Sequence, residues 1–152
     1  MATNCKFCEI AQRKAFSLPV YDDSECMGVL DINPITDGHT LLIPRKHHVG
    51  LWDLPFGMLS SMMSSAQKII QHYKRITGNP VYMMVMGEDQ DHHVKIHILP
   101  NCNRRFATAL RDCIKTQQNS IGSLNPAAGE RSWNKYKLPS LSNKYVSRYI
   151  SF

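Results

Sequence analysis

Apolar and polar side chains alternate along the segment from His93 to Leu99, and Pro100 follows it. Because successive side chains of a β-strand point to opposite faces, His93, Lys95 and His97 share one face, and the branched residues between them share the other. An ordinary surface strand can have the same alternation. The pattern therefore predicts a strand and leaves the role of its polar face open.

Short apolar runs bounded by turn-forming residues predict four more strands, at residues 20–22, 26–31, 39–43 and 81–86. Apolar side chains at a spacing of three to four residues predict a long helix that has Asp53 as its cap and ends before Gly78. Shorter patterns of the same kind predict helices over residues 5–13 and 106–114, and residues 118–143 are expected to be irregular. The strands surround one long helix without strand–helix–strand alternation. This organisation predicts an α+β domain built on an antiparallel sheet.

The composition limits the class of protein. With 152 residues, of which 43% are hydrophobic, the chain is expected to form one domain with an appendage. It has no apolar run long enough for a membrane span and no pattern typical of a signal peptide. Five cysteines, an odd number, favour reduced thiols or metal ligation over a disulfide framework, so a cytosolic or nuclear location is expected.

Positive charge is concentrated near the C-terminus. Residues 101–152 hold nine Lys and Arg against two acidic residues, whereas the whole chain has a net charge of +6. Aromatic residues lie between these cations, a mixture that can bind phosphates and stack on bases. The same features fit a basic extension that keeps the protein soluble and packs its aromatics on the domain. Both interpretations stay open, and nucleic acid is a candidate partner of this region.

Cys5 and Cys8 form a CxxC pair near the N-terminus. A redox CxxC normally lies in a strand–helix–strand unit, which the pattern does not predict here. A structural zinc site needs two further ligands, for which His47 and His93 are the candidates and His48 is a substitute for His47. The alternative is a pair of buried thiols in a small helix, with unrelated histidines nearby.

Three blocks in order along the chain resemble the histidine-triad (HIT) family of nucleotide-binding hydrolases and transferases. They are the CxxCxI of residues 5–10, the segment of residues 30–47 with its Asp, Pro, Gly-His and apolar strand, and the alternating strand that ends at Pro100. The resemblance covers about residues 4–100. When Pro100 places the closing motif, His93 and His97 match the first and third histidines. The middle one, the family's nucleophile, is Lys95.

The resemblance implies the HIT fold: a five-stranded antiparallel sheet with one long and one short helix. It implies a HIT domain over residues 1–102, followed by the basic extension of residues 103–152. Members of the family usually dimerise through the long helix and the strand that corresponds to residues 81–86. We therefore expect a homodimer.

The resemblance also implies ligands and roles for individual residues. A zinc ion would be held by Cys5, Cys8, His47 and His93. The carboxylate of Asp31 would accept hydrogen bonds from the ribose hydroxyls, and Ile10 and Leu30 would enclose a purine. For Asp31, a turn-forming role ahead of Asn33-Pro34 stays open.

The expected catalytic positions are those of Lys95, His97 and His39, where His39 orients its neighbours or is an ordinary core histidine. Counting back from His93, the pair that orients the phosphate in the family falls on Asp89 and Gln90, and the loop before them is short and acidic. These residues depart from the family pattern, and acidic groups disfavour an anion.

Lys95 is a poor substitute for a nucleophilic histidine. Its ordinary pKa is about 10.4, so freeing its lone pair at pH 7 costs about 4.6 kcal/mol. The sequence therefore predicts a zinc-stabilised protein that binds a purine nucleotide with lost or very weak hydrolase activity. The alternatives are an active nucleotidyl hydrolase or transferase acting on nucleoside phosphoramidates or dinucleoside polyphosphates, and a nucleic-acid-associated scaffold that uses residues 101–152.

Overall fold

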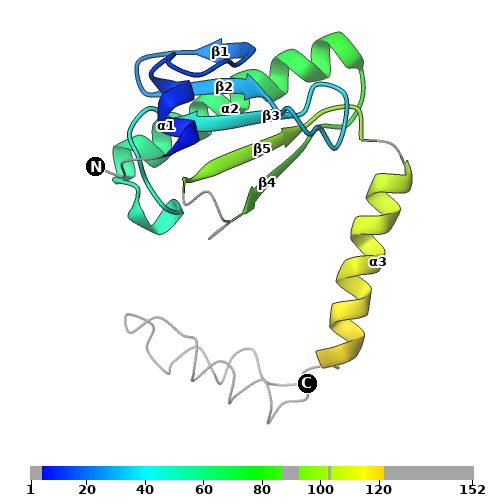
Figure 1. Cartoon of the computed structure of the whole chain (residues 1–152). Coiled ribbons are helices and arrows are strands. Elements are labelled where there is room, and N and C mark those ends of the chain that lie inside the picture. The colour runs from blue at the N-terminus through cyan, green and yellow to red at the C-terminus, as the bar shows by residue number, and fades with distance from the viewer. Residues whose placement is uncertain (1–4, 87–92, 103, 122–152) are drawn as a thin grey trace. The chain divides into compact units, whose positions relative to one another are not determined.

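The computed structural model describes residues 5–86, 93–102 and 104–121 of the chain. Nine helices and strands follow one another within these ranges (Figure 1): α1 (Lys6–Ala11), β1 (Pro19–Asp22), β2 (Cys26–Leu30), β3 (Thr40–Pro44), the 3-10 helix η1 (Leu51–Asp53), α2 (Phe56–Thr77), β4 (Tyr82–Met86), β5 (Lys95–Leu99) and α3 (Arg104–Ile121). No helix among the described residues is long and apolar enough to cross a membrane.

The five strands form one antiparallel sheet in the order β1-β2-β3-β5-β4. The predicted α+β class and five-stranded antiparallel sheet are confirmed. β5 therefore lies inside the sheet, where His97 pairs with Leu41 of β3 and with Met84 of β4. All five residues of β5 are buried, the polar ones along with the apolar ones.

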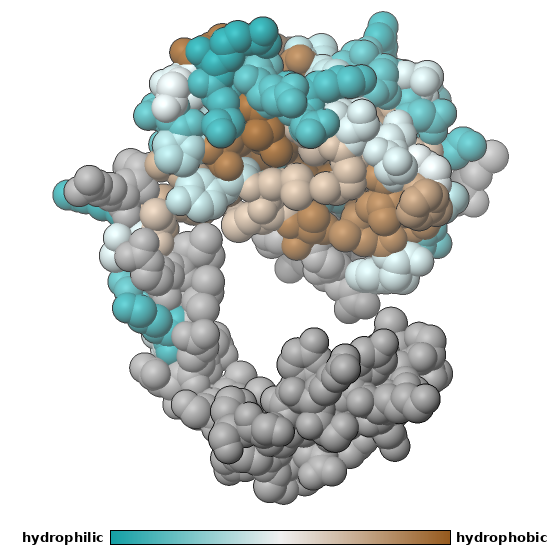
Figure 2. All heavy atoms as spheres, turned by 180° about the vertical axis from the view of Figure 1, so that it is seen from behind, coloured by the Kyte–Doolittle hydropathy of each residue, from teal (hydrophilic) through white to brown (hydrophobic). Residues whose placement is uncertain are grey.

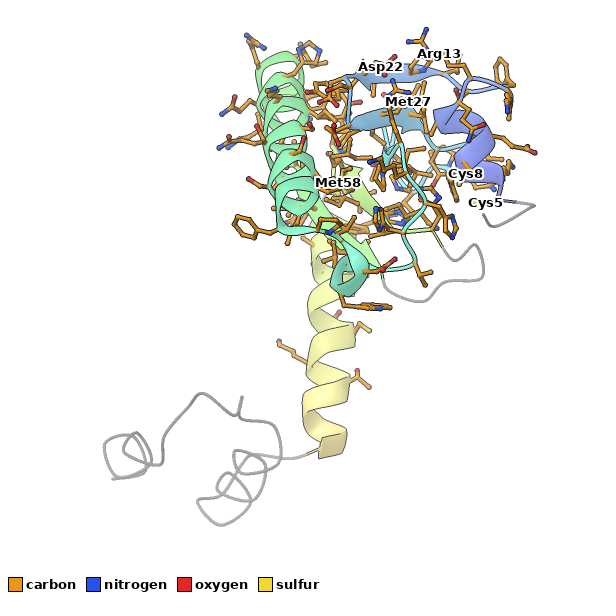
Figure 3. All side chains as sticks on the ribbon, turned by 90° about the vertical axis from the view of Figure 1, so that its left-hand side faces the viewer. Cys5, Cys8, Arg13, Asp22, Met27 and Met58 are labelled. Carbon is orange, nitrogen blue, oxygen red and sulfur yellow. The ribbon has the colours of Figure 1, made fainter. Side chains whose placement is uncertain are left out.

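Helices cover the two faces of the sheet, with α1 on one side and α2 on the other (Figure 3). The side chains of Ile96 and Ile98 belong to the core beneath α2, together with Met62 and Ile69 of that helix. The core on the other face includes Phe7 and Ile10 of α1, and Leu41 and Val29 of the sheet. Since side chains of a strand alternate, Lys95 and His97 lie on the α1 face.

Most element bounds differ from the sequence prediction by one or more residues, and the differences in β5, α2 and α3 affect the interpretation. β5 begins at Lys95, and His93 lies in the extended segment just before it. α2 begins at Phe56, because Asp53 belongs to η1, where its carboxylate accepts a hydrogen bond from the amide of Val49 (3.2 Å). α3 extends to Ile121, so residues 118–121 are helical and not irregular. The rest of the predicted irregular segment lies outside the described residues.

The chain divides after Phe106 into two units. The first contains the sheet with α1 and α2, and the second begins within α3. The predicted boundary between a domain of residues 1–102 and a basic extension of residues 103–152 stays a prediction.

Candidate functional site

Two cysteines and two histidines from three separate segments meet at the start of α1. Cys5 Sγ lies 3.3 Å from His93 Nδ1, and Cys8 Sγ lies 3.6 Å from the same nitrogen and 3.3 Å from His47 Nδ1. All four donor atoms lie within 4.8 Å of one another. Figure 3 labels the two cysteines on α1, and the histidines follow β3 and precede β5. The structure thus brings together the four predicted metal ligands.

The spacing of these atoms fits a tetrahedral zinc site. With a Zn–S bond of about 2.3 Å and a Zn–N bond of about 2.05 Å, a sulfur and a nitrogen on one zinc ion lie about 3.6 Å apart. The three sulfur–nitrogen separations of 3.3–3.6 Å are close to this value. Two thiols and two imidazoles are also a donor set that zinc prefers. His48 is not part of the cluster, since its ring faces the carboxylate of Asp53 at 3.4 Å.

The ring of His93 is held in the form that a metal requires. Its Nε2 donates a hydrogen bond to the carbonyl of Pro44 (3.3 Å), which leaves the Nδ1 lone pair directed at the thiols. Burial lowers the pKa of His93 to about 4, so the ring is neutral at pH 7. Burial and the neighbouring thiol of Cys5 raise the pKa of Cys8 to about 11, and a bound dication would reverse this by favouring the thiolate.

A cavity of about 520 Å³ lies on the α1 face of the sheet. Five of the predicted site residues line it: Ile10, Leu30, Asp31, Lys95 and His97. Among the described residues, the lysines and carboxylates that line it are Lys6, Lys95 and Asp31. A cavity of this size with an excess of positive charge suits an anionic organic ligand.

His39 lies behind the cavity and contacts His97. Its Nε2 is 3.0 Å from His97 Nδ1, and its Nδ1 accepts a hydrogen bond from the amide of Ile35 (3.3 Å). This second bond places the proton on Nε2, so His39 donates to His97. Burial lowers the pKa of His39 although the nearby Asp31 opposes the shift, so the His39 ring is neutral at pH 7. His39 can therefore fix the orientation of the His97 ring.

Asp31 combines the two roles that the sequence left open. One carboxylate oxygen accepts a hydrogen bond from the amide of Asn33 (2.9 Å), which is the turn-forming role. The other oxygen lies 3.4 Å from His39 Nδ1, and the residue lines the cavity. A turn residue thus presents a carboxylate to any ligand in the cavity.

Lys95 is only 4% exposed, and its ammonium lies over the ring of Phe7, 4.6 Å from the centroid. Sequence reasoning missed this contact. Helical spacing shows that Phe7 is buried, but not which residue of a distant strand it faces. Asp89 and Gln90, the other predicted contacts of the phosphate, lie outside the described residues.

Comparisons with known proteins agree with this geometry. A family model described as HIT domain matches residues 12–104. The adenylylsulfatase HINT3 of Arabidopsis thaliana is 28% identical over 109 residues, 68% of this chain, and the chain spans only 55% of that protein's length. The adenosine 5'-monophosphoramidase HNT1 of Saccharomyces cerevisiae is 30% identical over 98 residues, 63% of this chain and 61% of the yeast protein.

Solved structures share the fold. A zinc-bound histidine triad family protein of Mycobacterium smegmatis has a TM-score of 0.62 and 28% identity, covering 68% of this chain and 79% of its own. The match to the family model covers more than half of the 152 residues, and the sheet and its helices are arranged as in this relative. The chain therefore belongs to the HIT family.

Proposed function

We propose that this protein binds a purine mononucleotide in the cavity on the α1 face. The observation that supports this most directly is that the predicted nucleotide contacts line one cavity of suitable size. The ribose would hydrogen-bond to Asp31, and the base would lie between Ile10 and Leu30. The phosphate would lie near Lys95 and His97. The names of the two relatives, an adenylylsulfatase and an adenosine monophosphoramidase, favour an adenine nucleotide.

We further propose that Lys95 occupies the position of the family's nucleophile and that hydrolysis is lost or very weak. The side-chain nitrogen of Lys95 lies over the ring of Phe7, an arrangement that binds a cation, whereas a nucleophile needs a lone pair directed at the phosphorus. His97 and His39 keep the supporting hydrogen bond of an active site. The pocket would then hold a phosphate without cleaving its ester.

Zinc is the metal that we propose for the cluster of Cys5, Cys8, His47 and His93. Its donor set and atom spacing support this, as does the zinc-bound relative. With four protein ligands the site is closed, which is typical of a structural metal. The ion would fix α1, the helix that carries Phe7 and Ile10 into the core and the cavity.

We also propose a homodimer that forms through α2 and β4. β4 is an edge strand of the sheet. Its residues Met83 and Val85 are exposed, and so is Met63 of α2. Figure 2 shows that apolar side chains gather on one face of the first unit. A reducing compartment, the cytosol or the nucleus, is the proposed location, because the cysteines of the described residues are free thiols.

Calorimetry with AMP and CMP tests the proposed function on the zinc-loaded protein. AMP is expected to bind below 1 mM and more tightly than CMP, and Lys95→Met to weaken AMP at least about tenfold, because a hydrogen bond to a charged group is lost. Lys68→Met, which removes a lysine of α2 outside the cavity, is the matched control and should bind like the native protein. Absence of AMP binding up to millimolar concentration would contradict the proposal.

The same preparation distinguishes a binding protein from an enzyme. Turnover of adenosine 5'-phosphoramidate is expected at background level. Turnover above background that disappears in Lys95→Ala would show an active hydrolase in which the lysine takes part. Binding of nucleic acid by residues 101–152 stays a prediction, because most of that segment lies outside the described residues.

A further inference from the structure

Phe7 joins the metal cluster to the cavity. It stands between the two cysteines of α1, and its ring packs against the ring of His93 (centroids 5.9 Å apart, planes at 53°). The same ring lies beneath the ammonium of Lys95, 4.6 Å from the nitrogen, and it lines the cavity. One buried side chain therefore touches a candidate metal ligand and the candidate cation of the ligand site.

An aromatic ring holds a cation differently from a carboxylate. The ring attracts the ammonium through its quadrupole, and the contact is strengthened by burial, but it adds no negative charge. A carboxylate in the same place would cancel the charge of Lys95 and repel an incoming phosphate. The contact with Phe7 thus restrains a flexible four-carbon side chain and itself adds no negative charge beside it.

We propose that Phe7 is a positioning residue that holds the ammonium of Lys95 at the cavity wall as the anchor of a phosphoryl anion. The inference rests on the proposed nucleotide binding and deepens it, since it names what fixes the anchor. It also couples the anchor to the metal, because zinc held by Cys5 and Cys8 fixes the short helix that carries Phe7. The other end of α1 is tied by Arg45, whose guanidinium donates to the carbonyl of Ala11 (2.7 Å).

Coupling between two ligands is reciprocal. If zinc positions Phe7, and Phe7 positions Lys95 for a phosphate, then a bound nucleotide must in turn raise the affinity of the protein for zinc. The effect requires both the ring and the ammonium. It is therefore expected to vanish when either one is removed.

The test is a double-mutant cycle with AMP as the probe, on the zinc-loaded protein. Phe7→Leu keeps an apolar side chain and removes the ring face, and it is expected to weaken AMP binding about three- to thirtyfold. In the Lys95→Met protein, Phe7→Leu should lower the affinity for AMP almost no further. Met27→Leu, in the same core but outside the cavity lining, is the control. An equal loss of AMP affinity from Phe7→Leu in the native protein and in Lys95→Met would overturn the proposal.

A second variant covers the case in which Phe7→Leu fails to fold. A fluorinated phenylalanine at position 7 keeps the shape of the ring and weakens the negative charge of its face. Mass spectrometry then measures how fast an acylating reagent modifies Lys95, without any nucleotide. Faster modification than in the native protein is expected, because the ring then attracts the side chain less and restrains it less at the cavity wall, and an unchanged rate would overturn the proposal. This readout holds even if the native protein fails to bind AMP, a failure that would count against the proposed function alone.

Release of zinc to a chelator tests the coupling. AMP is expected to slow the release severalfold in the native protein and to have no effect in Phe7→Leu or Lys95→Met. An equal slowing in the native protein and in Lys95→Met would show that Lys95 does not carry the coupling.

Discussion

Removal of the metal from the cluster of Cys5, Cys8, His47 and His93 is expected to destabilise the fold strongly. The ligands come from three segments, and α1 is a helix of six residues. A helix this short is not stable alone in water, so it depends on what binds its side chains. The metal is one of these anchors, and the energy of metal binding is also folding energy.

The size of the effect follows from mass action. A ligand present at about a thousand times its dissociation constant stabilises the native state by about 4 kcal/mol. Packing also anchors α1, because Phe7, Ile10 and Ala11 are buried. For a domain of about 100 residues, each kcal/mol changes Tm by about 4–8 °C. A decrease in Tm of about 15 °C or more is therefore expected.

Thermal unfolding with and without a chelator measures this, together with elemental analysis of protein purified without added metal. Cys8→Ser should lower Tm by a similar amount and remove most of its response to the chelator, because serine is a poor zinc ligand. Cys113→Ser is the control, since Cys113 is an exposed thiol on α3 outside the cluster. About one zinc per chain is expected. Less than a tenth of an equivalent, with an unchanged Tm, would refute the reasoning.

Three further predictions concern single side chains. Asp31→Ala is expected to weaken AMP binding by about 1.5–3 kcal/mol in calorimetry. Asp31→Asn can still accept the turn hydrogen bond and so tests the charge alone. Equal AMP affinity of the native protein and both variants would contradict the ribose contact. Lys95→His should give little or no gain in the rate of phosphoramidate hydrolysis, since the groups that orient the phosphate would still be lacking. A rate increase above about 10³-fold, near 4 kcal/mol of activation free energy, would show that the rest of the site is intact. Burial opposes ionisation of Asp23, but hydrogen bonds from Tyr21, Ser65 and two backbone amides outweigh it and lower its pKa below 3.8. The contribution of Asp23 to the free energy of unfolding is then complete above pH 3.8 and is lost as the pH falls through the lower native pKa. The free energy of unfolding in urea should therefore change less between pH 7 and pH 3 in Asp23→Asn than in the native protein.

The sequence predicted the strands and the long helix because their side chains repeat with clear periods. Through the resemblance to a family, it also pointed to four residues that the structure brings together in the cluster and to five that line the cavity. The boundaries were less accurate. Asp53 resembles a helix cap, yet it serves the turn around Val49, a competing local hydrogen bond that periodicity does not reveal.

Contacts between distant segments were the part that could not be predicted. The pairing of Lys95 with Phe7 depends on how α1 packs on the sheet, and the 3.0 Å contact of His39 with His97 depends on the register of β3 and β5. Neither packing nor register follows from the spacing within one segment. The dual use of Asp31 is similar, because its two oxygens have different partners that only the folded chain brings near.

The central claim is that the cavity holds a purine nucleotide with its phosphate on Lys95. A crystal structure of the zinc-loaded protein grown with AMP tests it most directly. The account predicts the phosphate within hydrogen-bond distance of Lys95 and His97, the ribose on Asp31 and the adenine between Ile10 and Leu30. A cavity that stays empty at millimolar AMP, or a nucleotide whose phosphate lies away from Lys95, would contradict it.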